Sequence, residues 1–236
     1  LMTQSDTDGL ILRWGVDRAI ITLLEKIAKR EGIGDILAEG TQRAAARIGR
    51  GAEAFAIHIG GQEVPLHNPT LVPGYITTYI VYATPGRHMQ VGDMSSVAGL
   101  PTAKYDTAST DPHNRAEYHK LIADIVHVAN ASGVCLFAHY SYSWPFMADF
   151  LEAVTGWEWP LETVRKTGER IGTMRHLFNL REGVNFLKYP IPGRVVGDPP
   201  QATGPVKGRT VDYRTMVREY LKHVDWDLVT TVPSRR

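Results

Sequence analysis

Apolar residues recur along this chain at the three- and four-residue spacing of an α-helix in six separate segments. The first covers residues 18–31, with Asp17 able to cap its start and Gly32 able to end it. The second covers residues 35–48 and opens at Asp35. The others are expected over residues 115–129, 145–154, 160–178 and 213–223. The pattern therefore predicts a mainly α chain.

Two long stretches, residues 63–108 and 189–208, lack this periodicity and are rich in proline and glycine. Irregular segments of this length inside a compact domain are usually functional loops, linkers or unrecognised elements. We expect them to be loops that could line a site. We also expect a domain boundary near residue 60, between a two-helix segment and a larger helical domain.

Composition excludes several classes of partner. The chain carries 26 basic and 25 acidic residues and no Lys/Arg block, so neither nucleic acid nor an anionic membrane is implied as a partner. No apolar run approaches the roughly 20 residues of a membrane span, and the start of the chain lacks the pattern of a signal peptide. A single cysteine fits a reducing compartment, so we expect a cytoplasmic location. Because Leu1 precedes a methionine, we expect the chain to be a piece of a longer protein.

The one cysteine, Cys135, follows the segment expected to be helical over residues 115–129. A single thiol cannot form a disulfide within the chain, and zinc or an iron–sulfur cluster requires several ligands. From its surroundings alone, Cys135 is either a small core residue or one ligand of a site whose other ligands lie elsewhere.

Six short stretches, in order and at similar spacing, carry a resemblance to a known family. They are DTDGL with RWG at 6–15, IAKREGIGDILAEG at 27–40, EVPLHNP at 63–69, GRH at 86–88, GVC at 133–135 and RHLFNLREG at 175–183. Together they resemble the C-terminal region of the aldehyde ferredoxin oxidoreductase family, the tungsten- or molybdenum-pterin enzymes, over nearly the whole chain.

This resemblance implies two helical domains with long irregular loops lining the site. Residues 1–60 would end a second domain, and residues 61–236 would form most of a third. It also implies a tungsten or molybdenum bis-pterin and a [4Fe-4S] cluster between the domains. The remaining N-terminal part of the same protein would supply the other cluster cysteines, so the isolated chain is expected to hold no cofactor.

The stretch NASGVC at 130–135 matches the family's second pterin-contacting motif. By resemblance, Cys135 takes the position of the fourth cluster ligand. The residues expected to contact the cofactor are Asn130, Gly133, Val134 and Leu136. Asn130 stands where the family usually has Asp, and ordinary capping of a helix end is the alternative role for this side chain.

His88 lies where the family carries a histidine proposed as a proton donor, although Arg87 before it departs from the family pattern. An imidazole suits proton transfer because its ordinary pKa lies near the operating pH. The alternative is a loop histidine satisfied by backbone. Glu63 and His67 either contact the cofactor or support the substrate cavity, or, as we favour, form a satisfied polar pair in a proline-braced segment.

Other candidates have mainly structural interpretations. Arg181 and Glu182 are expected to form a buried ion pair that holds the last helices; the alternative is that they hold residues of the site in place from behind. His119 and His127, eight residues apart, are expected at the surface or rim. Aromatic residues that either line a substrate cavity or simply pack are Tyr75, Tyr79, Tyr82 and Trp144.

The resemblance thus implies an enzyme that oxidises a small aldehyde to a carboxylic acid. Its electrons would pass through the cluster to ferredoxin, and a homo-oligomer is possible. One alternative is a ring-reducing tungsten enzyme of the benzoyl-CoA reductase type. Another is a non-catalytic helical interaction module.

Overall fold

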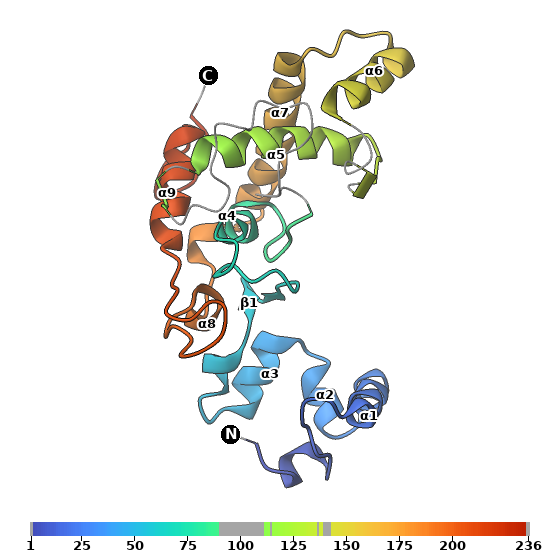
Figure 1. The fold of residues 1–236 in the computed structure, drawn as a ribbon, viewed down its shortest axis with the longest axis vertical. Helices are drawn as coiled ribbons and strands as arrows, with labels where there is room; N and C mark the ends of the chain where they lie inside the picture. The colour runs from blue at the N-terminus through green and yellow to red at the C-terminus, as the bar shows by residue number, and fades with distance from the viewer. Residues whose placement is uncertain (1, 90–110, 114, 136, 139–142, 235–236) are drawn as a thin grey trace.

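The computed structural model describes residues 2–89, 111–113, 115–135, 137–138 and 143–234. It is mainly helical, which confirms the predicted fold class (Figure 1). Among the described helices, none is long and apolar enough to cross a membrane. The elements in order are η1 (Ser5–Thr7), α1 (Asp17–Lys29), α2 (Ile33–Leu37), α3 (Thr41–Ile48), η2 (Ala52–Phe55), β1 (His58–Ile59), β2 (Gln62–Glu63), α4 (Gly74–Val81), α5 (Ala116–Ala131), α6 (Trp144–Thr155), α7 (Leu161–Arg181), η4 (Phe186–Lys188), α8 (Gly193–Val196) and α9 (Tyr213–His223).

The helix predicted over residues 35–48 is wrong, because two helices, α2 and α3, occupy this region. The break lies at Gly40, whose φ of 84° is in the left-handed region that favours glycine. The carboxylate of Glu63 then accepts a hydrogen bond of 2.6 Å from the backbone N–H of Thr41. This carboxylate satisfies one of the free N–H groups at the start of α3.

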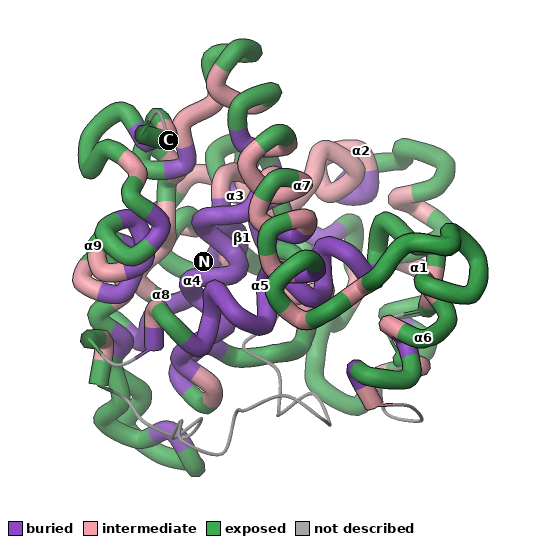
Figure 2. The backbone as a smooth tube through the Cα atoms, turned by 90° about the horizontal axis from the view of Figure 1, so that it is seen from above, coloured by how far each residue is buried: buried purple, intermediate pink, exposed green. Residues whose placement is uncertain are grey.

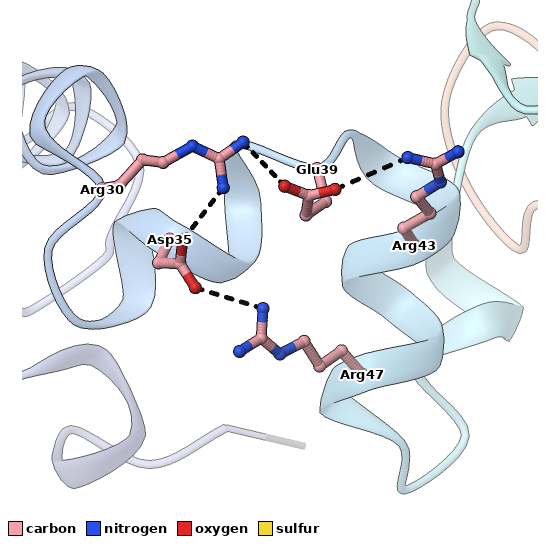
Figure 3. Close-up of polar contacts among 5 residues, drawn as sticks. All are labelled: Arg30, Asp35, Glu39, Arg43 and Arg47. Carbon is pink, nitrogen blue, oxygen red and sulfur yellow. Dashed lines mark hydrogen bonds and ion pairs between the residues drawn. The ribbon is translucent and has the colours of Figure 1, made fainter.

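Ion pairs join α1, α2 and α3 at the surface (Figure 3). Arg30, just after α1, reaches Asp35 at 2.9 Å and Glu39 at 2.7 Å. Arg47 on α3 contacts Asp35 at 3.2 Å, and Arg43 contacts Glu39 at 3.5 Å. Hydrogen bonds from Arg30 lower the pKa of both carboxyls. Exposed pairs of this kind stabilise by at most about 1 kcal/mol each, so the network orients these helices more than it holds them together.

The core lies around α4 and α5, which Figure 2 shows as buried segments near the centre of the molecule. α5 packs against α7 and α9, and α4 packs against α9. Every residue of α4 is buried. This helix lies inside the stretch for which we predicted no regular structure. A helix covered on all sides has no polar face, so it lacks the alternation that reveals an amphipathic helix.

A short antiparallel hairpin, β1–β2, lies between the N-terminal helices and the core, and it pairs His58 with Glu63. The N-terminal helices meet the rest of the described chain through α3 with β2 and through η2 with α8. The division of the chain near residue 60 stays a prediction.

Candidate functional site

Two histidines from separate loops meet beside the start of α4. The ring centroids of His67 and His88 are 4.3 Å apart. Tyr75 completes the cluster, with its ring 5.1 Å from His67 and 5.8 Å from His88. Burial, followed by the neighbouring His67, lowers the pKa of His88. The His88 ring is therefore neutral at neutral pH, half-buried, and able to accept a proton.

The buried helix α4 holds both histidine loops in place. The Tyr79 hydroxyl donates a 3.0 Å hydrogen bond to the backbone carbonyl of His67. The Tyr79 carbonyl accepts a 2.9 Å hydrogen bond from the N–H of Gly86. Gly86 has a φ of 71°, and a Cβ there would come within 3.0 Å of the Glu63 carbonyl oxygen. Glycine at this position therefore lets the His88 loop lie close to the end of β2.

Asn130 connects α5 to the same loop. Its side-chain N–H donates a 3.1 Å hydrogen bond to the carbonyl of Met89, the residue after His88. The described contacts thus give the Asn130 amide a partner in the loop, not at the end of its own helix. Among the described residues its side-chain oxygen, an acceptor, has no hydrogen-bond partner.

Beyond Asn130 the chain turns sharply at Gly133. This residue has a φ of 74°, and a Cβ built on it would meet no atom within 4 Å, so its surroundings are open. Val134 is half-buried, while Cys135 is exposed and does not pack in the core. The Cys135 carbonyl accepts a 2.9 Å hydrogen bond from Ala138. Leu136, the remaining predicted contact, lies outside the described residues.

The residues on this turn fit one edge of a larger cofactor site. A [4Fe-4S] cluster is held by four cysteine thiolates, and this chain contains one cysteine, so it can supply one ligand. The exposed Cys135 thiol, the open backbone at Gly133 and the side-chain oxygen of Asn130 lie within six residues of each other. Within the described ranges, no group of three His, Cys, Asp or Glu side chains could hold a metal ion.

The structure differs from the expectation for two residue pairs, Arg181–Glu182 and Glu63–His67. Arg181 and Glu182 do form a bond of 3.0 Å, but their side chains are 70% and 52% exposed, so the expectation of a buried pair was wrong. Glu63 and His67 have separate partners: Glu63 binds the start of α3, and His67 joins the imidazole cluster. The structure thus places His67 nearer to the candidate site than our favoured interpretation did.

The expectation that His119 and His127 lie at the surface or rim was also wrong. Their exposed fractions are 1% and 3%. The polar residues interspersed among the apolar ones of α5 made the helix look amphipathic, with polar faces turned to solvent. Packing by α7 and α9 covers those faces as well.

The four aromatic candidates lie in three places. Tyr75 and Tyr79 border the histidine cluster, with their rings 5.9 Å apart. Tyr82 instead lies in the interior, where its hydroxyl donates to that of Tyr220 at 3.3 Å. Trp144 is buried at the start of α6. Sequence reasoning missed that the Tyr79 hydroxyl anchors the His67 backbone, because no spacing rule links those positions.

The chain is similar to one known protein family over its whole length. A family model described as "Aldehyde ferredoxin oxidoreductase, domains 2 & 3" matches residues 1–236. The tungsten-containing aldehyde ferredoxin oxidoreductase of Pyrococcus abyssi is 32% identical over 100% of this chain and 39% of its own length. The protein of the same name from Pyrococcus furiosus is 30% identical over 97% of this chain and 37% of its own length.

Two further matches are proteins whose names refer to other reactions. The aliphatic sulfonate oxidoreductase, WOR-like subunit, of Pyrococcus furiosus is 29% identical over 96% of this chain and 35% of its own length. A solved chain of the active site complex BamBC of benzoyl coenzyme A reductase, in complex with 1,5 dienoyl-CoA, superposes with a TM-score of 0.64. This match has 22% identity and covers 99% of this chain and 39% of that one, so it concerns the fold. The chain therefore spans about two-fifths of the length of these relatives.

Proposed function

This chain belongs to the aldehyde ferredoxin oxidoreductase family, and we propose that it forms part of a tungsten-pterin enzyme that oxidises small aldehydes to carboxylic acids. The observation that supports the proposal best is the hydrogen bond from Asn130 to Met89. It joins the motif that resembles a pterin contact to the loop that carries His88. A cofactor contact and a proton-transfer group are needed side by side in such an enzyme.

In this proposal, one turn of chain serves both redox groups. Asn130, Gly133 and Val134, with Leu136, contact the pterin, and the Cys135 thiolate is one ligand of a [4Fe-4S] cluster. When bound, the tungsten-pterin supplies two-electron oxidation, and the cluster passes electrons on singly. Asn in place of Asp at position 130 offers the pterin N–H groups a neutral acceptor, which is weaker than a carboxylate.

His88 is the proposed catalytic residue, and it handles the proton that leaves or enters the substrate. Its lowered pKa keeps the ring neutral at neutral pH, so one ring nitrogen is free to accept a proton. His67, with its ring centroid 4.3 Å away, is positioned to orient the His88 ring. Tyr79 fixes the backbone of His67, so the pair rests on the rigid helix α4.

The remaining parts of the proposal concern the whole protein. The N-terminal part of the same protein supplies the other cluster ligands and the rest of the pterin site, and ferredoxin accepts the electrons. The enzyme acts in the cytoplasm, with molybdenum as the alternative metal and a homo-oligomer as a possible assembly.

A second candidate is a ring-reducing enzyme of the benzoyl-CoA reductase type. The likeness of fold to the BamBC complex favours it, together with the departures from the aldehyde-oxidising pattern at Arg87 and Asn130. The two reactions differ in substrate and in direction of electron flow, so one set of assays separates them.

The test is to purify the full-length protein without oxygen and measure tungsten, molybdenum and iron. Aldehyde-dependent reduction of ferredoxin is then compared with reduction of benzoyl-CoA by a low-potential donor. Tungsten or molybdenum with aldehyde-dependent reduction is expected. Activity on benzoyl-CoA alone would favour the second candidate. A protein without either metal and without either activity would be a non-catalytic helical module.

A further inference from the structure

The interior of the helical core contains an unexplained polar side chain, His127 on α5. It is 3% exposed, and neither of its ring nitrogens has a hydrogen-bond partner among the described residues. Buried polar groups in folded proteins are almost always bonded, to protein or to ordered water, because an unmet donor or acceptor destabilises the fold. A small bound molecule beside the His127 ring would therefore stabilise the fold, provided that there is space for it.

A small cavity lies where such a partner would have to be. It is lined by residues of α5, α7, α9 and the end of α4, and its volume is about 20 Å³. This volume accommodates one water molecule, and a site for water also needs two to four polar partners. The residues with polar side-chain groups that line the cavity include Tyr82, Lys120, Asp124, His127, Glu169, Thr173, Arg175, His176 and Tyr220.

Two glycines on α7 allow this arrangement. A Cβ on Gly168 would collide with the backbone of Asp124, so glycine lets α5 and α7 lie in direct contact. One turn further, a Cβ on Gly172 would stand 2.9 Å from Nε2 of His127. The missing side chain leaves space next to this nitrogen.

The polar groups around the cavity suit a neutral ligand that both donates and accepts hydrogen bonds. Lys120 donates to both carboxylate oxygens of Asp124 at 2.6 Å and lies 3.4 Å from Glu169. Burial, followed by Arg175 and Lys120, lowers the pKa of His127 to about 3, so its ring is neutral. A neutral imidazole has one donor and one acceptor nitrogen. The Asp124 oxygens keep further lone pairs free to accept.

We propose that this cavity is a specific site for one internal water molecule, which bridges the imidazole of His127 and the buried Lys120–Asp124 pair. A water molecule both donates and accepts, so it can satisfy the ring and a carboxylate oxygen together. It would also hold α5 against α7. The positions Lys120, Asp124 and His127 follow one face of α5 toward Asn130, the helix end that carries the proposed cofactor motif.

The direct test is a high-resolution crystal structure of the full-length protein. The expected result is a well-ordered water within hydrogen-bond distance of a ring nitrogen of His127 and of Asp124. A cavity without such density, or a His127 ring bonded directly to protein, would overturn the proposal.

A second test does not depend on crystals and uses His119 as a matched control. His119 is also on α5, is 1% exposed, has unpartnered ring nitrogens and packs on the Tyr82 ring, but it does not line the cavity. Replacing an unsatisfied buried histidine by leucine should stabilise a protein, whereas removing the partner of a bound water should destabilise it.

The two variants are His127→Leu and His119→Leu in the full-length protein, and thermal unfolding is measured for each. We expect His127→Leu to lower the Tm by a few degrees and His119→Leu to leave it unchanged or raise it. If His127→Leu raises the Tm or leaves it unchanged, His127 has no bound partner and the proposal fails. Equal losses for both variants would show that only ring packing against Tyr82 was removed, and would also overturn it.

Discussion

The molecule contains two pairs of histidines in contrasting surroundings. His67 lies on the loop before α4 and His88 on the loop after it; both are at least partly open to solvent, and their rings are 4.3 Å apart. His119 and His127 lie inside the helical core, and both flank the ring of Tyr82. Burial lowers the pKa of His88, and it lowers the pKa of each core histidine to about 3. His88 on its partly exposed loop can therefore be reached by a substrate, whereas the two core histidines are sequestered from solvent.

The largest expected effect comes from the loop pair. His88→Ala in the full-length enzyme should lower turnover by roughly 10²–10⁴-fold, the usual contribution of a general acid or base. Tungsten and iron content should stay the same, because no proposed ligand is removed. His113→Ala serves as the control, since that histidine is 63% exposed. Normal turnover in a fully loaded His88→Ala enzyme would reject the assignment, and loss of cofactor would indicate a binding or folding role.

The two core histidines, His119 and His127, should make the free energy of unfolding depend on pH. In the folded protein His119 and His127 have a pKa of about 3, against an ordinary value of 6.5 in the unfolded chain. Between pH 6.5 and 3 the unfolded state binds more protons, so the stability present above pH 6.5 is lost as pH falls. Each histidine should account for on the order of 4 kcal/mol of this loss at pH 3.

Urea unfolding of the full-length protein across this pH range measures the effect. The wild-type free energy of unfolding is compared with that of the His127→Leu variant. The variant should lose less stability on acidification than the wild type. Identical slopes for the two proteins would show that His127 is not held neutral in the core.

The contact of α5 with α7 should be sensitive to one added methyl group. Gly168→Ala should destabilise by roughly 1–3 kcal/mol because the Asp124 backbone cannot move aside. Part of this loss is offset by the better helix propensity of alanine, about 1 kcal/mol. Gly172→Ala should cost less, since it meets only the His127 ring. Chemical unfolding measures both, and an equal or larger loss for Gly172→Ala would contradict the described packing.

The smallest expected effects come from removing one tyrosine hydroxyl beside the histidine loops and one in the helical core. They should differ in whether turnover changes. Tyr79→Phe removes the 3.0 Å hydrogen bond to the His67 backbone and should cost about 1 kcal/mol of stability and some turnover. Tyr82→Phe removes the 3.3 Å bond to Tyr220 in the core and should change stability only. Thermal unfolding and steady-state assays of both variants check this. A loss of turnover in Tyr82→Phe equal to that in Tyr79→Phe would remove the distinction.

The sequence predicted the helices that keep one polar face, and α9 matches the predicted residues 213–223. It did not reveal α4, whose residues are all buried, or the break at Gly40, which depends on backbone conformation and on Glu63 from a later strand. Similarly, the motifs around His88 and Cys135 could be identified from the sequence. The bond between Asn130 and Met89 could not, because such long-range contacts follow from packing and leave no local pattern.

The central claim is that the turn after α5 carries a ligand of a redox cluster. The most direct measurement is the iron content and electron paramagnetic resonance spectrum of full-length Cys135→Ser, purified without oxygen. Ser132→Ala is the matched control, because Ser132 lies on the same turn and its hydroxyl bonds the Val128 carbonyl at 2.8 Å. We predict that Cys135→Ser loses iron or changes the cluster spectrum while Ser132→Ala retains both. Unchanged iron and an unchanged spectrum in Cys135→Ser would contradict the account.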